Sequence, residues 1–200
     1  MGRHGTGRLI REGPPTRGGR SEKGGTPAES RSRQALGISR GGLTTKMHVL
    51  SDQRCRALAV VLSGGEVHDS KMVGAVLDSV RVPRPGKGRP RKRPNRTLGD
   101  KGYSYPSCRA VFQERGIAVM IPERSDQRVR RKKKGRAGGR PRCFDRKVYC
   151  NRNVVERCFL RLKQWRRIAT RYDKDVLCYQ AWITLANIII WLRTELANTL

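Results

Sequence analysis

Residues 43–62, LTTKMHVLSDQRCRALAVVL, decide the fold class of this chain. The run Leu43–Leu50 contains β-branched residues in rough alternation, and the run Arg56–Leu62 is almost entirely aliphatic. Between them, Ser51, Asp52 and Gln53 have the composition of a turn. Two strand-like runs that are joined by a short polar turn predict an antiparallel β-hairpin.

Helical and strand-like segments alternate after this hairpin. The pattern predicts the following elements in order: a helix over Lys71–Val80 that Asp69 caps, a strand that ends at Thr97–Asp100, a helix over Tyr105–Arg115 that stops at Gly116, a strand over Ile117–Ile121, a helix from Tyr149 to about Ile168 and a last helix over Val176–Leu196. This order is typical of an α/β domain with a mixed sheet and flanking helices.

The charge of the chain indicates a polyanionic partner. The sequence contains 45 Lys and Arg against 16 Asp and Glu, which gives a formal net charge of +29. Such an excess opposes compaction unless a polyanion neutralises it, and nucleic acid gains affinity from each phosphate contact. Charge alone favours DNA and RNA equally. The basic segments 81–96 and 124–147 are expected to be flexible and to bind phosphates.

Other classes of protein are excluded by composition. The six cysteines form no CxxC pair and the three histidines lie far from them, so neither a zinc ribbon nor a disulfide framework is expected. Reduced thiols indicate the cytoplasm. The apolar stretch Ile183–Leu192 is too short to span a bilayer, so a buried helix and no membrane contact are expected. Residues 1–34 are rich in Gly, Arg, Ser and Pro and are expected to be disordered.

Two carboxylates stand out from the basic background. Asp100 ends a predicted strand, and Glu156 lies on the helix that starts near Tyr149, in the spacing Tyr149-x2-Arg152-x3-Glu156-x6-Lys163. Positions i and i+4 share a helix face, so Glu156 is expected beside Arg152, with Lys163 two turns further along. This face predicts a metal-binding carboxylate between two cations. The simpler alternatives are a helix cap for Asp100 and an exposed ion-paired face for Glu156.

This spacing resembles the signature of the DDE transposases of bacterial insertion sequences, in the groups numbered four and five. Four blocks carry the resemblance, which covers residues 35 to 193: SRGGLTTKMHVL at 39–50, LGDKGYS at 98–104, GRAGGRP at 135–141 and NRNVVERCFLRLKQWRRIATRYDK at 151–174.

The resemblance implies a ribonuclease-H-like fold in which three acidic residues hold two divalent ions, Mg²⁺ or Mn²⁺. Such ions assist an in-line phosphoryl displacement on DNA, and Mg²⁺ prefers carboxylate oxygens. By position, Asp100 is the second catalytic acid and Glu156 the third, and both are metal ligands. Arg152 and Lys163 contact DNA, and Tyr149 supports that surface. The implied partner is double-stranded DNA at insertion-sequence ends, bound by a homodimer or larger complex near the bacterial nucleoid.

One departure from the family concerns the first acid. The family carries it on the strand before the hairpin, in an Asp-[Gly/Ser]-[Thr/Ser] motif, and no Asp precedes Ser39 here. We therefore expect a domain over 35–197 that lacks its first strand and first acid, as in a truncated or frameshifted copy. The alternatives are an inactive DNA-binding remnant and, less favoured by the spacing, a ribosomal-type RNA-binding protein.

Overall fold

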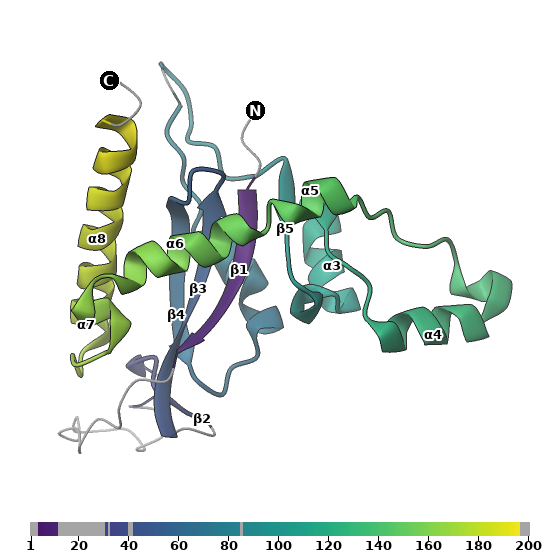
Figure 1. Cartoon of the computed structure of the whole chain (residues 1–200), viewed down its shortest axis with the longest axis horizontal. Helices are drawn as coiled ribbons and strands as arrows, with labels where there is room; N and C mark the ends of the chain where they lie inside the picture. The colour runs from purple at the N-terminus through teal and green to yellow at the C-terminus, as the bar shows by residue number, and fades with distance from the viewer. Residues whose placement is uncertain (1–3, 12–30, 32, 40–41, 85, 197–200) are drawn as a thin grey trace.

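A mixed β-sheet forms the centre of the computed structural model, which describes residues 4–11, 31, 33–39, 42–84 and 86–196 (Figure 1). Its main strands lie in the order β4-β3-β1-β5-β6. Strand β3 is antiparallel to both β1 and β4, whereas β5 and β6 are parallel to β1. The strands are β1 (His4–Arg11), β2 (Gly37–Ser39), β3 (Gly42–Asp52), β4 (Ala57–Gly64), β5 (Arg96–Leu98) and β6 (Ala118–Met120).

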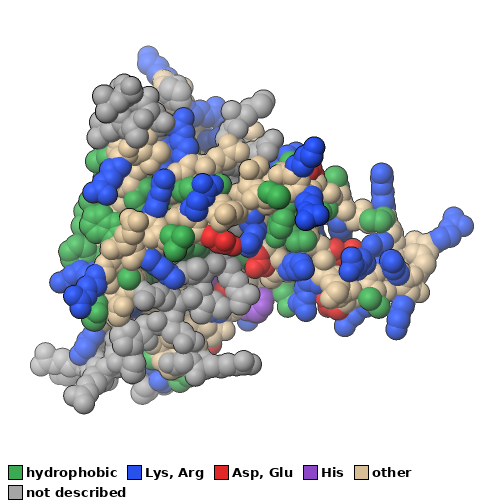
Figure 2. All heavy atoms as spheres, viewed as in Figure 1, with side chains coloured by type: hydrophobic (Ala, Val, Ile, Leu, Met, Phe, Trp, Pro, Cys, Tyr) green, Lys and Arg blue, Asp and Glu red, His purple; other side chains and the backbone are tan. Residues whose placement is uncertain are grey.

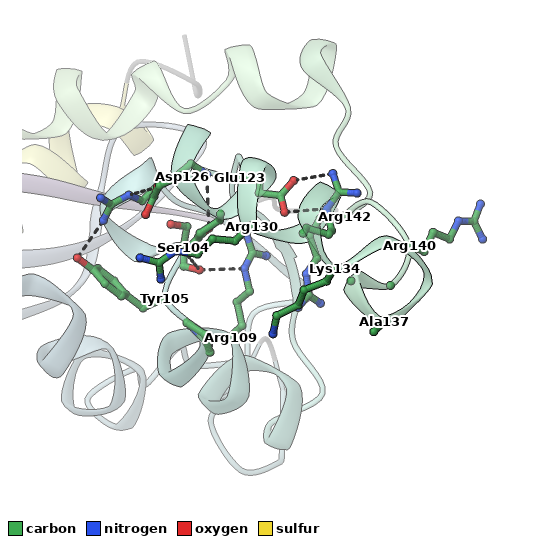
Figure 3. Close-up of a pocket in the computed structure, with 16 residues that line it drawn as sticks. Ser104, Tyr105, Arg109, Glu123, Asp126, Arg130, Lys134, Ala137, Arg140 and Arg142 are labelled. Atoms are coloured by element: carbon green, nitrogen blue, oxygen red, sulfur yellow. Dashed lines mark hydrogen bonds and ion pairs between the residues drawn. The ribbon is translucent and has the colours of Figure 1, made fainter.

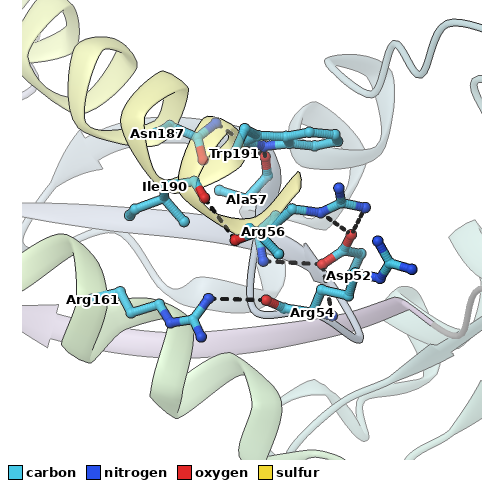
Figure 4. Close-up of polar contacts among 9 residues, drawn as sticks. Asp52, Arg54, Arg56, Ala57, Arg161, Asn187, Ile190 and Trp191 are labelled. Carbon is cyan, nitrogen blue, oxygen red and sulfur yellow. Dashed lines mark hydrogen bonds and ion pairs between the residues drawn. The ribbon is translucent and has the colours of Figure 1, made fainter. Parts of the chain in front are cut away.

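The predicted hairpin is confirmed as β3 and β4. The Asp52 carboxylate closes the turn between them, because it accepts hydrogen bonds from the backbone nitrogens of Arg54 at 2.9 Å and Arg56 at 3.0 Å (Figure 4). Cys55 adopts φ +61°, a left-handed conformation that the tight turn imposes. The hairpin is therefore fixed by its own turn as well as by its ladder.

Two helices hold this turn in place. The Arg161 guanidinium on α6 (Asn153–Lys163) donates to the carbonyl of Arg54 at 3.1 Å. On α8 (Val176–Leu196), the side chains of Asn187 and Trp191 both donate to the carbonyl of Ala57, at 3.0 and 3.1 Å. Figure 4 shows these donors converging on the turn from separate helices. The two helices are thereby fixed relative to the sheet.

Strand β1 lies within residues 1–34, the segment that was expected to be disordered and to lack the first strand. Residues His4–Arg11 pair with β3 from His4↔Asp52 to Arg11↔Thr45, and with β5 at His4↔Thr97 and Gly5↔Leu98. The sequence HGTGRLIR shows no clear strand pattern, because pairing with strands on both sides can impose an extended conformation on a segment of weak propensity. Residues 12–30 lie outside the described residues, so the boundary near residue 35 stays a prediction.

Helices cover both faces of the sheet. One face packs against α6, α7 (Arg166–Ala169) and α8, with Val49, Phe159 and Ile183 in its core. The other packs against η1, α2 and α3, with Leu50, Leu77 and Phe112 in its core. The remaining helical elements are η1 (Asp69–Met72), α2 (Val73–Asp78), η2 (Lys101–Tyr103), α3 (Pro106–Glu114), α4 (Ser125–Lys133), η3 (Gly135–Gly138) and α5 (Arg146–Cys150). The α/β prediction is confirmed at this level.

Some helix boundaries differ from the predicted ones. His68, not Asp69, caps η1, since its ring nitrogen accepts from the backbone nitrogen of Ser70 at 3.2 Å. The helix expected from Tyr149 to Ile168 is three short helices, because Asn151 ends α5 and Gln164 ends α6. Helix α4 lies in a segment that was expected to be a flexible loop. Asp126 in the first turn and the basic residues of the last turn favour this helix electrostatically, although it has no apolar face.

Helix α8 is confirmed, but only one of its faces is buried. Tyr179, Ile183 and Ala186 pack into the core, whereas Leu177 and Leu192 are exposed. The helix is long and apolar enough to cross a membrane by length and composition alone, yet its hydrogen bonds to Ala57 tie it to the sheet.

Candidate catalytic and DNA-binding surface

Asp100 lies two residues beyond the carboxyl end of β5. The β5–α3–β6 unit is a parallel crossover, and ligands of parallel sheets bind outside the carboxyl ends of their strands. Asp100 also caps η2, because one oxygen of its carboxylate accepts a hydrogen bond from the backbone nitrogen of Gly102. Its other oxygen makes no hydrogen bond to any described residue. The cap alternative is therefore correct, and it leaves half of the carboxylate available to a ligand.

Helix α5 brings Tyr149 to this edge of the sheet. Asp145 caps the helix by accepting from the backbone nitrogens of Lys147 at 2.8 Å and Val148 at 3.2 Å. Val148 is buried against Leu98 of β5 and Met120 of β6, and Tyr149 packs against the same cluster. The apolar contact thus fixes the start of the basic helical region beside the strand that leads to Asp100.

The pKa of Tyr149 depends on the charges near its phenol. Burial raises this pKa above its ordinary value, the Arg152 guanidinium lowers it, and the negative charges of Asp100 and Glu156 raise it further. The phenol therefore lies within electrostatic reach of both carboxylates.

Arg152 and Glu156 form the ion pair that their spacing predicts. The Arg152 Nη2 atom lies 2.6 Å from Glu156 Oε1, with side chains 33% and 50% exposed. The same guanidinium lies 5.8 Å from the centre of the Tyr149 ring. Because both side chains remain accessible to solvent, an approaching phosphate or cation can reach them. The pair orients Glu156 without burying it.

Lys163 occupies the opposite end of the same helix. It is the last residue of α6, seven positions after Glu156, which corresponds to about 10 Å along the axis. There it lines a small cavity together with Phe159 and Ile168. Arg152 contacts Glu156 and lies near the Tyr149 ring, and Asp100 acts electrostatically on the Tyr149 phenol, whereas Lys163 lies further along the helix.

The amphipathic pattern of α6 explains why the face that carries Glu156 points toward solvent. Val155, Phe159 and Leu162 are almost completely buried against the sheet. Glu156 and Arg157 lie outside this buried stripe and are exposed. Figure 2 shows the resulting face, where Lys and Arg side chains surround a small acidic area beside α6.

The donor set suits one hard cation better than two. Two carboxylates can hold an ion such as Mg²⁺ that keeps several waters. Within the described part of the chain, no group of three or more His, Cys, Asp or Glu side chains could hold a metal. A site for two ions would need a further acid.

Sequence reasoning missed a buried polar cluster under the sheet. His48 Nε2 lies 2.8 Å from Ser63 Oγ, and Lys46 Nζ lies 3.7 Å from a carboxylate oxygen of Asp69. Burial lowers the pKa of His48 to about 4, although the nearby Asp69 acts in the opposite direction. The alternation of Lys46 and His48 with Met47 and Val49 is the signal that places these polar residues on the second face of the sheet.

The chain is similar in sequence to proteins of a known family. Residues 17–192 match the model of a family described as the transposase DDE domain. The chain is 27% identical over 150 residues to a Burkholderia cepacia protein described as a transposase for insertion sequence element IS402, covering 75% of this chain and 64% of that protein. It is 26% identical over 155 residues to a Brucella ovis protein described as a transposase for IS6501, covering 76% of this chain and 100% of that protein. No solved structure matches the chain.

Proposed function

The chain belongs to the DDE transposase family, and from this premise we propose that it acts in DNA transposition as the domain that binds DNA and cuts and joins its strands. The chain matches only 64% of the length of the IS402 relative. The activity of a complete transposase is therefore proposed for this chain and does not follow from the similarity alone. The supporting observation is that Asp100 and Glu156 both lie within electrostatic reach of the Tyr149 phenol, and that Glu156 pairs with Arg152 on the same helix face.

The sheet order supports a ribonuclease-H-like fold as part of this proposal. Three antiparallel strands (β4, β3 and β1) are followed by two that are parallel to β1, with helices on both faces. In this arrangement Asp100 follows β5, which is the neighbour of β1. A first acid on β1 would therefore lie in the strand next to the second.

Each site residue has a distinct proposed role. Asp100 and Glu156 act as catalytic metal ligands, while Tyr149, Arg152 and Lys163 bind DNA. A bound Mg²⁺ or Mn²⁺ would supply Lewis-acid stabilisation of the charge that develops on the phosphate. Arg152 holds Glu156 in one orientation and offers its remaining donors to a phosphate, since a guanidinium has more donors than one carboxylate can use. Lys163 contacts the phosphate backbone further along the bound DNA strand. The proposed setting is the bacterial cytoplasm, with DNA ends bound by a homodimer.

A second candidate, an inactive DNA-binding remnant, is favoured by the composition of β1. The strand contains no Asp or Glu, and it begins with His4-Gly5-Thr6. This triplet matches the last two positions of the family motif Asp-[Gly/Ser]-[Thr/Ser] and has His at the first. His4 pairs with Thr97, three positions before Asp100. These observations support a domain that has a strand in the first position but lacks the acid there.

Nicking of supercoiled plasmid DNA tests the leading proposal. The wild type is expected to nick slowly with Mg²⁺ or Mn²⁺, and Glu156→Ala or Asp100→Ala is expected to abolish this activity. Glu114→Ala removes an exposed carboxylate at the end of α3 and is the matched control. Nicking that survives loss of Glu156 would contradict the assignment.

The variant His4→Asp separates the two candidates. If loss of the first acid causes the weakness of the site, restoring it should raise metal-dependent nicking above the wild-type level. Absence of nicking in both proteins, with DNA binding that is indifferent to metal and steeply weakened by salt, would favour the remnant. Tighter binding of RNA than of duplex DNA would contradict both.

A further inference from the structure

Residues 123–142, which we call the arm, form a separate basic projection beside the candidate site. The arm leaves the body after β6, runs through α4 and η3, and returns toward α5 (Figure 1). It contains ten Lys or Arg and two acids. None of the residues of α4 is buried. Its position therefore depends on polar contacts with the body.

Two hydrogen bonds join the base of the arm to the body, and an ion pair within the arm closes its base. Arg131 makes a bidentate pair with Glu123, at 3.0 and 3.1 Å. The Gln127 amide donates to the carbonyl of Ser104 at 3.2 Å. The Arg124 guanidinium donates to the Tyr105 hydroxyl at 3.0 Å. The last two partners lie four and five residues after Asp100, so the arm is anchored to the segment that follows the second proposed acid.

Between the arm and α3 lies a basic cavity of about 600 Å³. Arg109, Arg130, Lys134 and Arg142 line it, together with Glu123 and Asp126. In Figure 3 the Lys134 side chain reaches back toward Arg109, whereas Arg140 points away from the body. The side chains of Arg130, Lys134 and Arg142 make no hydrogen bond to any other described residue, and the two acids are engaged by Arg131 and Arg124.

Like charges in this cavity oppose one another. The guanidinium of Arg109 donates to the carbonyls of Ser104 and Ile121, which holds it at the cavity wall. Burial lowers the pKa of Arg109, and the charge of Arg142 lowers it further. An anion between these groups would relieve the repulsion and meet the open donors. A phosphate offers several acceptor oxygens to such donors.

We propose that this cavity is a second DNA-binding site, in which Arg130, Lys134 and Arg142 clamp the phosphate backbone of duplex DNA against α3. The inference rests on the proposed function, because it extends the DNA path from the α6 face onto the arm. The cations continue along the exposed side of α4, which suits a partner with phosphates at regular intervals rather than a single small anion. Backbone phosphates provide affinity without base contacts.

Binding of a labelled duplex DNA in the absence of metal tests the proposal. The pocket variant replaces Arg130, Lys134 and Arg142 with Ala. The matched control replaces Arg128, Lys132 and Arg136, which lie in the same arm but do not line the cavity. Both variants lose three positive charges. The pocket variant is expected to flatten the dependence of log K on log salt by about 2 to 3, and the control by less than about 1.

Further measurements show whether a loss of DNA binding comes from the missing side chains or from misfolding. Thermal unfolding by circular dichroism must match the wild type in both variants, as expected for side chains outside the core. The variant Lys134→Arg keeps the charge and should bind like the wild type. Binding is measured without metal and nicking with metal, so a failure of this proposal and a failure of the catalytic one are distinguishable.

Three outcomes would overturn the proposal. Equal losses in the two triple variants would indicate a diffuse charge effect instead of a built cavity. Calorimetric binding of inorganic phosphate that the pocket variant abolishes, with unchanged DNA affinity, would assign the cavity to a free anion. A larger loss of RNA binding than of duplex DNA binding would assign it to RNA.

Discussion

The helix α6 and the arm are both strongly basic, but they are held in different ways. Helix α6 is fixed by an apolar stripe in which Phe159 and Leu162 are almost completely buried. The arm buries no residue of α4 and is fixed by polar contacts of Glu123, Arg124 and Gln127. Chemistry on DNA needs carboxylates at defined positions, which a packed helix provides. Phosphate binding tolerates a looser support. The difference fits the proposed catalysis at the first region and the proposed DNA binding at the second.

Removing an apolar side chain should lower the stability of the protein far more in α6 than in the arm. Phe159→Ala leaves a cavity between α6 and the sheet, and we expect the free energy of unfolding to fall by about 3–5 kcal/mol. Val129→Ala, on an exposed position of α4, should change it by less than about 0.5 kcal/mol. Denaturant titration measures both. Similar losses would show that α4 is packed as tightly as α6.

The body should also carry a pH dependence that comes from a buried histidine, a residue type that the arm does not contain. His48 has a pKa of about 4 in the folded protein, against about 6.5 in an unfolded chain. Between these values the unfolded state binds more protons, so stability is complete above about pH 6.5 and falls by about 3 kcal/mol as the pH drops toward 4.

Unfolding free energies measured from pH 7 to pH 4 test this dependence. His48→Gln should remove most of the slope, because Gln does not titrate. The exposed His68 provides the control, and His68→Gln should keep the slope. If both variants keep the wild-type slope, other groups cause the dependence.

Weakening the base of the arm should loosen it without unfolding the body. Glu123→Gln removes the charge that pairs with Arg131, whose hydrogen bonds are the main cause of the lowered pKa of Glu123. We expect global stability to change by about 1 kcal/mol or less. Limited trypsin digestion should nevertheless cut within 123–142 faster than in the wild type. The control Glu114→Gln should be cut at the wild-type rate, and unchanged cleavage in both would show that other contacts hold the arm.

The smallest effect on stability is expected at the face of α6. The Arg152–Glu156 pair is solvent-exposed, so Arg152→Ala should change the free energy of unfolding by about 0.5 kcal/mol or less. The same variant should weaken duplex binding, because it removes a cation beside the acids. A large stability loss with unchanged DNA affinity would give Arg152 a structural role instead.

Local patterns were sufficient to predict segments in which apolar residues recur at regular spacing or a glycine adopts a left-handed conformation. The hairpin follows from its two aliphatic runs, and α6 follows from Val155, Phe159 and Leu162. The end of α3 follows from Gly116, which adopts φ +59° in the structure. In the candidate site, the i and i+4 spacing predicted the pairing of Arg152 with Glu156. These features depend on residues close together in the sequence.

Features that depend on distant partners could not be predicted in the same way. Strand β1 has little pattern of its own and is defined by its pairing with β3 and β5. Helix α4 has no apolar face, so the charges near its ends and its contacts with Ser104 and Tyr105 position it. The meeting of Asp100 with Tyr149 requires α5 to pack against β5 and β6. Tertiary contacts decide each of these.

The central place of β1 has a consequence for how the chain folds. Without it, the sheet consists of the β3–β4 hairpin, which forms from neighbouring residues, and a separate β5–β6 pair. Strand β1 joins them by contacts that span from Arg11↔Thr45 to His4↔Thr97. Such long-range closure slows folding, and until it occurs both halves expose an open strand edge. During synthesis β1 is made before both of its partners, and β5 follows β3. Strand β1 therefore stays unpaired on one side until β5 has been made.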